Sequence, residues 1–210
     1  MKIAVIGTGN VGRALGPRWA ANGHQVTYGS RDPHSQKVRD LVAASGANAS
    51  ATTSPEAAAD AEVVVLATPW EATEAIVRSF GDLTGKLVVD ATNPLTHEEL
   101  GLSVGHTSSA GEQVAAWAKG ARVVKAFNMT GARNMTNPDY HGQPITMFIC
   151  GDDAEAKRVV AGLTTELGFE SVDAGSLSVA RELEPLAVLW IRLAYMLGLG
   201  TNIAFKLLRR

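Results

Sequence analysis

The feature that most constrains the fold lies at the start of the chain, where a short apolar run leads directly into a glycine-rich turn. Residues 2–6 have the pattern of a buried parallel strand, and Gly7, Gly9 and Gly12 follow in a G-x-G-x-x-G arrangement. The first glycine permits a sharp turn, the second lets a pyrophosphate approach the backbone, and the third lets the next helix pack closely. That helix directs free N–H groups and a partial positive charge at the phosphates. The pattern therefore predicts a dinucleotide site rather than a turn that binds nothing.

The end of the second expected strand, residues 25–28, indicates which dinucleotide is bound. Sites that prefer NAD place an acid about 20 residues beyond the glycines, where it binds the ribose 2′-hydroxyl. Here Ser30 and Arg31 occupy that position, and Lys37 adds a second positive charge nearby. A hydroxyl and a guanidinium suit a 2′-phosphate, so the cofactor is predicted to be NADP(H). Asp32 is expected to point away.

Strands and helices continue to alternate along the chain. This pattern predicts an α/β fold with a doubly wound, mostly parallel Rossmann sheet and a small C-terminal helical extension. We expect residues 1–128 to form the dinucleotide-binding domain, and residues 129–210 a C-terminal lobe with the acceptor site and a dimer interface. Loops are predicted at 96–107, where mobility is expected, and at 131–144. Further strands are predicted at residues 49–51, 61–67, 86–90, 122–127, 145–150 and 170–173.

Several polar or aromatic residues directly follow predicted strands. In a doubly wound sheet the ligand lies outside the carboxyl ends of the strands. Thr68, Pro69 and Trp70 should therefore wall the cofactor cleft, while Asn93 meets the nicotinamide end. Asn128 closes the sixth strand and is predicted to orient the nicotinamide carboxamide, whereas Asp90 is expected to be a structural hydrogen-bond acceptor. Cys150 lies in an apolar strand, where a buried and inert thiol is expected.

No acid–base pair and no metal-ligand spacing stand out in the sequence, and the five histidines are scattered over turns and loops. Hydride transfer between two ring cofactors requires neither, because the protein then supplies binding, orientation and exclusion of water. The net charge of −2 gives no indication of nucleic-acid binding. A single cysteine, a strand in place of a signal peptide and the lack of a long apolar run favour a cytoplasmic protein outside the membrane.

Residues 186–199 form the most apolar segment of the chain. They predict a final helix that is apolar nearly all round, separated from the preceding helix by a break or kink at Pro185. Such a helix must be buried, either in the interface of a homodimer or in the core of the domain. Arg192 would then need a carboxylate or carbonyl partner.

Six short motifs occur in an order that is similar to the NADPH-dependent coenzyme F420 reductases and to the cytosolic NADPH-binding domains of the STEAP metalloreductases. The resemblance covers nearly the whole chain. It implies that Thr8, Gly9, Asn10 and Val11 hold the pyrophosphate, that Ser30 and Arg31 hold the 2′-phosphate, and that Trp70 lies beside the cofactor. The motifs are GTGNVG at 7–12, SR at 30–31, PW at 69–70, VVKAFN at 123–128, CGDD at 150–153 and VDAG at 172–175.

The identity of the hydride acceptor stays open at this point. The segment DATNPL at 90–95 departs from the archaeal F420 reductases, and KAFN at 125–128 is closer to the STEAP-like domains. The first expectation is an NADPH-dependent oxidoreductase that exchanges a hydride with a deazaflavin, coenzyme F420, stacked on the nicotinamide. The alternatives are a flavin (FMN or FAD) or ferric reductase, a reductase of small C=N or C=O compounds, and a non-enzymatic NADPH sensor.

Overall fold

A computed structural model describes residues 1–96 and 99–210 of the chain. One sheet of eight strands organises it, in the order β10-β9-β6-β5-β4-β1-β2-β3, and a short hairpin of β7 and β8 stands apart. The first six strands along the chain, β1 to β6, lie at the positions expected from the sequence. The strands are β1 (Lys2–Ile6), β2 (Gln25–Gly29), β3 (Ala49–Thr52), β4 (Val63–Leu66), β5 (Leu87–Asp90), β6 (Arg122–Lys125), β7 (Asp139–Tyr140), β8 (Gln143–Pro144), β9 (Thr146–Gly151) and β10 (Glu170–Asp173).

The six neighbouring strands β6, β5, β4, β1, β2 and β3 are all parallel, as a dinucleotide-binding sheet requires. The direction reverses at β9, which pairs antiparallel with β6 through Lys125 and Cys150, and β10 then runs parallel to β9. The predicted fold class, a mostly parallel doubly wound sheet, is confirmed. The sheet includes β9 and β10, which follow the predicted domain boundary at residue 128. Both halves of the chain therefore contribute strands to one sheet.

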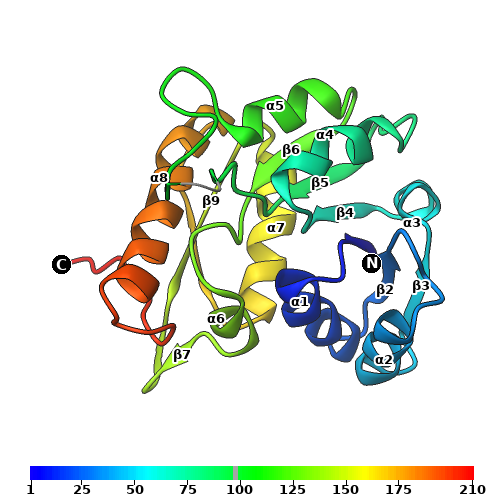
Figure 1. Ribbon diagram of the computed structural model, residues 1–210, viewed down its shortest axis with the longest axis horizontal. Coiled ribbons are helices and arrows are strands. Elements are labelled where there is room, and N and C mark those ends of the chain that lie inside the picture. The colour runs from blue at the N-terminus through cyan, green and yellow to red at the C-terminus, as the bar shows by residue number, and fades with distance from the viewer. Residues whose placement is uncertain (97–98) are drawn as a thin grey trace.

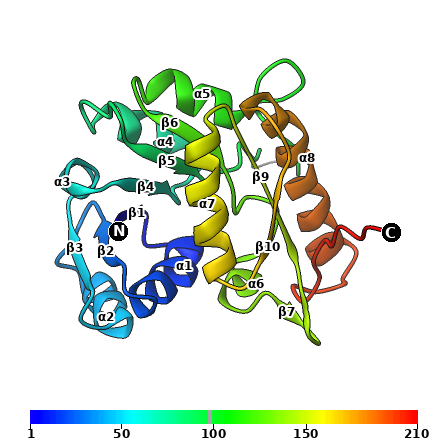
Figure 2. The ribbon, with the colours of Figure 1, turned by 180° about the vertical axis from the view of Figure 1, so that it is seen from behind.

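Helices cover both faces of the sheet. Figure 1 shows α4 and α5 above β4, with α1 and α2 below it, and Figure 2 shows α7 between α1 and the C-terminal helix α8. In the described residues no helix is long and apolar enough to cross a bilayer. The helices are α1 (Asn10–Ala21), α2 (Gln36–Ser45), α3 (Ser54–Asp60), α4 (Trp70–Arg78), α5 (Ala110–Trp117), α6 (Ala132–Thr136), α7 (Ala154–Glu166) and α8 (Ala180–Ile191), with a 3-10 turn at Leu177–Val179.

The two hydrophobic cores follow from the alternation of side chains along each strand. In β1, Ile3 and Val5 face the core that contains α1 and α7, whereas Ala4 and Ile6 face the core that contains α3, α4 and α5. The strands are apolar on both faces because both faces are covered. This explains why the central strands are uninterrupted apolar runs in the sequence.

Three expectations for the C-terminal half were wrong: the break at Pro185, the extent of the last helix to residue 199, and the loop at 131–144. Pro185 does not break the helix, since α8 runs through it and continues as one π-helical turn over Arg192–Met196. The helix then ends, so residues 197–199 lie outside it. The predicted loop at 131–144 contains α6 and the β7–β8 hairpin. Of the loop predicted at 96–107, residues 97 and 98 lie outside the described part of the chain.

After α8 the chain returns along β9. The N–H of Thr146 donates to the carbonyl of Phe205 at 3.1 Å, and the indole N–H of Trp190 donates to the carbonyl of Ile203 at 2.8 Å. The guanidinium of Arg192 lies 3.5 Å from the carbonyl oxygen of Leu100. The indole of Trp190 is thus held by the C-terminal segment, and it lines the same cavity as Asn10 at the start of α1.

Candidate functional site

The glycine turn after β1 places the backbone of α1 directly against neighbouring backbone. A Cβ at Gly12 would lie 2.1 Å from the carbonyl oxygen of Gly7, and a Cβ at Gly7 would lie 2.3 Å from that of Ala67. Gly7 also has a φ of +111°, a conformation that side chains rarely adopt. By contrast, a Cβ at Gly9 would meet no atom within 4 Å. Gly9 therefore faces open space, in accordance with the prediction that a ligand approaches there.

A cavity of about 500 Å³ lies in front of this turn. It extends from the start of α1 across the end of β2 to the end of β4, at the carboxyl edge of the sheet. Eight of the thirteen predicted site residues line it, which places the glycine turn and the expected 2′-phosphate position in one hollow. They are Gly7, Thr8, Gly9, Ser30, Arg31, Lys37, Thr68 and Pro69.

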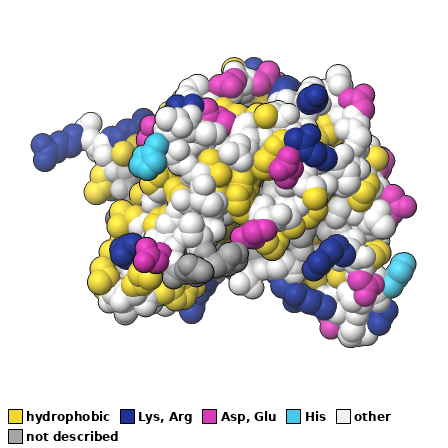
Figure 3. Space-filling model, turned by 45° about the horizontal axis from the view of Figure 1, so that its top comes forward, with side chains coloured by type: hydrophobic (Ala, Val, Ile, Leu, Met, Phe, Trp, Pro, Cys, Tyr) yellow, Lys and Arg dark blue, Asp and Glu magenta, His cyan; other side chains and the backbone are white. Residues whose placement is uncertain are grey.

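Two cations in this cavity are available for an anionic ligand. Among the described residues, neither the Arg31 guanidinium nor the Lys37 ammonium has an ion-pair or hydrogen-bond partner. Asp32 does not line the cavity, and its carboxylate accepts the N–H of His34 at 3.2 Å. Figure 3 shows Lys and Arg side chains at the lower right of the face drawn, the side on which Figure 1 places α1 and α2. This arrangement suits a phosphate on the ribose.

A second cavity, of about 430 Å³, shares Thr68 and Pro69 with the first, so the two adjoin at the carboxyl edge of the sheet and are together called the cleft. Val11, Trp70 and Asn93 line it. Asn93 was predicted at the nicotinamide end, Trp70 beside the cofactor and Val11 at the pyrophosphate, and these roles stay predictions. The indole of Trp70 packs against that of Trp117, with ring centroids 5.3 Å apart, which fixes its orientation. The lining of this second cavity thus combines apolar and aromatic groups with the Asn93 amide.

Glu71, in the first turn of α4, also lines this second cavity and was not identified from the sequence. The signal that could have found it is its position directly after Trp70, at a predicted strand end. An acidic residue in a first helical turn has an ordinary structural explanation, because it complements the helix dipole.

Asn128 lies behind the cleft and does not line either cavity. Its Nδ2 donates to Asn93 Oδ1 at 3.1 Å and to the carbonyl of Leu183 at 2.8 Å, and Asn93 Nδ2 donates back to the carbonyl of Asn128 at 2.8 Å. The preceding residue, Phe127, has a φ of +62°, a backbone conformation that is strained for any residue other than glycine. Its ring is held edge-on between Trp19 and Phe169. The role of Asn128 in orienting the nicotinamide stays a prediction, to which the structure adds contact with Asn93.

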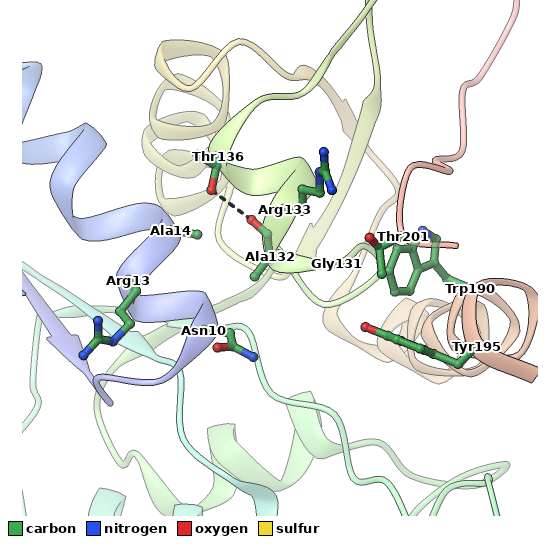
Figure 4. Close-up of a pocket in the computed structure, with 10 residues that line it drawn as sticks. All are labelled: Asn10, Arg13, Ala14, Gly131, Ala132, Arg133, Thr136, Trp190, Tyr195 and Thr201. Carbon is green, nitrogen blue, oxygen red and sulfur yellow. Dashed lines mark hydrogen bonds between the residues drawn. The ribbon is translucent and has the colours of Figure 1, made fainter. Parts of the chain in front are cut away.

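Asn10 faces a third cavity, of about 360 Å³, between α1, α6 and the C-terminal helix. Figure 4 shows its amide directed toward the space beside Tyr195 and Trp190, while the Arg13 side chain points away from them. The guanidinium of Arg13 donates to the backbone carbonyls of Thr8 and Lys37. Pyrophosphate binding by Asn10 stays a prediction.

Two buried groups near the cleft behave as structural groups. Asp90 Oδ1 accepts the N–H of Thr92 at 2.9 Å and its hydroxyl at 2.7 Å, which supports the expectation for this residue. Cys150 is fully buried, and burial raises the pKa of its thiol to about 12. Since the thiolate is the reactive form, the prediction of an inert cysteine is supported.

A matched pair of glycine variants separates packing from binding. Gly12→Ala should lower the free energy of unfolding by about 1–3 kcal/mol, because the new methyl group collides with backbone. Gly9→Ala should leave unfolding nearly unchanged but weaken NADPH binding roughly tenfold, since loss of one phosphate hydrogen bond costs about 1.5 kcal/mol. Denaturant titration and fluorescence titration of NADPH measure the two effects. Equal losses of stability in both variants would contradict this assignment.

Arg31→Ala tests the 2′-phosphate site. A charge-assisted hydrogen bond contributes about 1.5–3 kcal/mol, so NADPH affinity should fall roughly ten- to a hundredfold. NADH lacks the 2′-phosphate, so its affinity for the variant should be almost unchanged. Calorimetric titration of both cofactors measures the difference, and Arg39→Ala, an exposed change on α2 outside the cavity, is the control. A similar loss for NADH and NADPH would show that Arg31 does not read the phosphate.

Comparisons with known proteins agree with this geometry. The family profile described as NADP oxidoreductase, coenzyme F420-dependent, matches residues 2–94. The F420-dependent NADP reductase of Methanothermobacter thermautotrophicus is 32% identical over 209 residues, which cover 92% of this chain and 89% of that protein. A crystal structure of a candidate F420-dependent NADP reductase from Arthrobacter sp. FB24 has a TM-score of 0.91 at 36% identity, with both chains covered in full.

The metalloreductase STEAP3 of Rattus norvegicus is 33% identical over 208 residues. The match covers 97% of this chain but only 40% of that protein, so the chain spans less than half the length of this relative. The archaeal enzyme, by contrast, is matched over nearly its whole length, and the predicted family and the predicted cofactor NADP(H) are confirmed. The chain belongs to the F420-dependent NADP reductase family and is an NADP-dependent oxidoreductase.

Proposed function

We propose that this enzyme transfers a hydride between NADP(H) and coenzyme F420, with the deazaflavin ring stacked on the nicotinamide. The observation that supports this most is the pair of adjoining cavities at the carboxyl edge of the sheet. One contains the glycine turn and the free cations Arg31 and Lys37, and the other is lined by Pro69, Trp70 and Asn93. A dinucleotide laid along both has its phosphates at the turn and its nicotinamide at the wall that these last three residues form. A cytoplasmic location is part of the proposal, supported by the single, buried cysteine.

The acceptor site is proposed in the C-terminal lobe, at the third cavity. Its walls combine Gly131 with the aromatic side chains of Trp190 and Tyr195, whose rings pack edge to face at 6.2 Å. Asn10 lies at its rim, one residue from Val11, which lines the nicotinamide end of the cleft. A planar ring acceptor that enters here approaches the cofactor from the side opposite the wall of Trp70. The predicted lobe of residues 129–210 then supplies the second substrate.

Ring-to-ring transfer requires no proton donor in the walls, whereas the alternative reductases would have to use a group such as Glu71. A reductase of C=N or C=O bonds needs a proton donor for the developing amine or alkoxide. A deazaflavin or flavin spreads the incoming charge over its own ring and takes a proton from water afterwards. The protein then contributes chiefly by orienting the two rings and excluding water.

The decisive assay is anaerobic and uses purified protein, NADPH and one acceptor at a time. Coenzyme F420, FMN and FAD are each followed by the loss of absorbance of the oxidised ring, and an imine and an aldehyde serve as non-ring acceptors. We expect F420 to be reduced fastest. Reduction of a flavin alone would favour the flavin reductase alternative. Reduction of only the imine or aldehyde would overturn the proposal and direct attention to Glu71 as a proton donor. NADPH binding without any turnover would favour a sensor.

Tyr195→Ser tests the position of the acceptor site. An aromatic pair contributes about 0.5–1.5 kcal/mol, so loss of the ring should raise the KM for the acceptor roughly two- to tenfold. NADPH affinity should be unchanged, since Tyr195 lies outside the cofactor cleft. Steady-state kinetics with each substrate varied in turn measures both. An increase in KM for NADPH instead of the acceptor would place the two sites differently.

We also propose that the enzyme is a homodimer that uses the end of the C-terminal helix. Three large apolar side chains at and beyond the end of the π-helical turn, and Leu189 before it, are between 45% and 65% exposed and lie outside the acceptor cavity. They are Leu189, Met196, Leu197 and Leu199. An apolar surface of this kind, contiguous along the chain, is typical of a protein–protein contact. A second copy is the expected occupant, because a self-complementary patch closes into a symmetric dimer.

Light scattering at micromolar concentrations tests the dimer. The wild-type protein should have twice the mass of the chain, whereas Met196→Glu and Leu197→Glu together should shift it to a monomer, because the new carboxylates would be buried in the contact. Ala21→Glu, at the exposed end of α1, is the control. A monomeric wild-type protein across this range would refute the dimer.

A further inference from the structure

Three charged side chains form a buried cluster beneath the nicotinamide wall. Lys125 Nζ lies 2.8 Å from Asp90 Oδ2 and 2.8 Å from Glu184 Oε1, and it donates to the carbonyl of Thr92 at 2.7 Å. The side chains of Lys125, Asp90 and Glu184 are at most 1% exposed. The three N–H groups of the ammonium therefore each have a partner, two of them at the end of β5 and the third on α8.

The charges in the cluster are compensated by the surrounding backbone. Glu184 accepts the N–H groups of Ala110 and Gly111, at 3.0 and 3.1 Å, in the first turn of α5. The positive end of that helix stabilises the second carboxylate. Burial disfavours the charged form of Lys125, but the adjacent carboxylates outweigh this and raise the pKa of its ammonium above the ordinary value.

Stability alone does not explain such a cluster. Apolar side chains of similar volume would hold these segments together as well or better, because burying charges is costly. What an ion cluster adds is direction, since each hydrogen bond fixes the angle as well as the distance between its partners.

The cluster fixes the segment that forms the cleft wall. The N–H and hydroxyl of Thr92 are held by Asp90, and its carbonyl is held by Lys125. The next residue, Asn93, lines the cleft and exchanges hydrogen bonds with Asn128, which in turn donates to the carbonyl of Leu183. Leu183 and Glu184 of α8 are therefore joined to the wall by two routes.

We infer that Lys125 and Glu184 are positioning residues for hydride transfer, which hold Asn93 against the nicotinamide and keep α8 in register with it. The same helix carries Trp190, in the wall of the proposed acceptor cavity. One rigid connection thus sets the distance between the donor and acceptor sides of the site. The inference rests on the proposed function for its chemistry, although its effect on the bound cofactor can be measured without an acceptor.

The test uses Glu184→Gln, which removes one charge and keeps the length of the side chain. NADPH affinity should stay within about threefold of wild type, since the phosphate contacts are unchanged. The single-turnover rate of hydride transfer should fall about tenfold or more, because a misplacement of about 1 Å can cost roughly a hundredfold in rate. The fluorescence lifetime of bound NADPH should shorten, since a loosely held nicotinamide loses its excited state faster.

Two further variants keep the test decisive. If Glu184→Gln does not fold, Lys125→Met combined with Asp90→Asn and Glu184→Gln removes all three charges, so that no buried charge is left without a partner, and the same losses of lifetime and rate are expected. Lys157→Met is the control, because it breaks the ion pair with Asp173, 2.9 Å apart, between α7 and β10 and outside the cleft. It should lower stability but leave lifetime and rate unchanged.

The outcomes distinguish the inference from the proposed function. Lifetime and transfer rate equal to wild type in a folded Glu184 variant would overturn the inference and make the cluster purely structural. If the wild-type protein reduces no ring acceptor, the proposed function fails, and the lifetimes of bound NADPH still decide the inference. A shorter lifetime in both Glu184 variants, with the Lys157 control unchanged, would support it.

Discussion

The close backbone approach at the glycine turn, of α1 to the end of β1 and of Gly7 to the end of β4, is the constraint on which the rest of the molecule depends. Gly7 and Gly12 leave no room for a side chain, so the helix starts against the sheet and its first turn faces the cleft. Of the three glycines in this turn, Gly9 is the one that faces open space. The same short segment therefore provides both tight packing and access for a ligand. The order of the strands on either side then places Ser30 and Arg31 beyond one flank of the turn, and Thr68 and Pro69 beyond the other.

The reversal of direction at β9 determines how the C-terminal half completes the site. An antiparallel strand beside β6 brings α7 back against α1, where the indole N–H of Trp19 donates to the carbonyl of Leu163 at 3.3 Å. Arg18 similarly donates to the carbonyl of Met135 in α6 at 2.8 Å. These contacts hold α6 and the end of the chain opposite the glycine turn. The third cavity exists because segments more than a hundred residues apart meet there.

The geometry at the end of β6 depends on strain that the surrounding core sustains. Phe127 adopts a positive φ, and its ring is fixed by Trp19 on one side and Phe169 on the other. The turn that results directs Asn128 toward Asn93, instead of continuing the strand. Strained backbone of this kind persists only where packing over-determines it, and it is common at functional sites. A buried ion cluster immediately beneath adds a second, directional constraint on the same loop.

Apart from α6 and the β7–β8 hairpin, the sequence by itself determined the order of strands and helices, the glycine turn and the pair Ser30 and Arg31, because each depends on local pattern and on the general geometry of parallel sheets. It also identified Trp70 and Asn93, which follow predicted strands. Only the tertiary structure decided that Asn128 acts on Asn93 from behind, that Asn10 faces the third cavity, and that Lys125 pairs with Glu184. Those contacts join residues distant in the chain, and spacing carries no information about them. Pro185 was misread for a related reason, since tertiary packing of α8 outweighs the local preference of proline to end a helix.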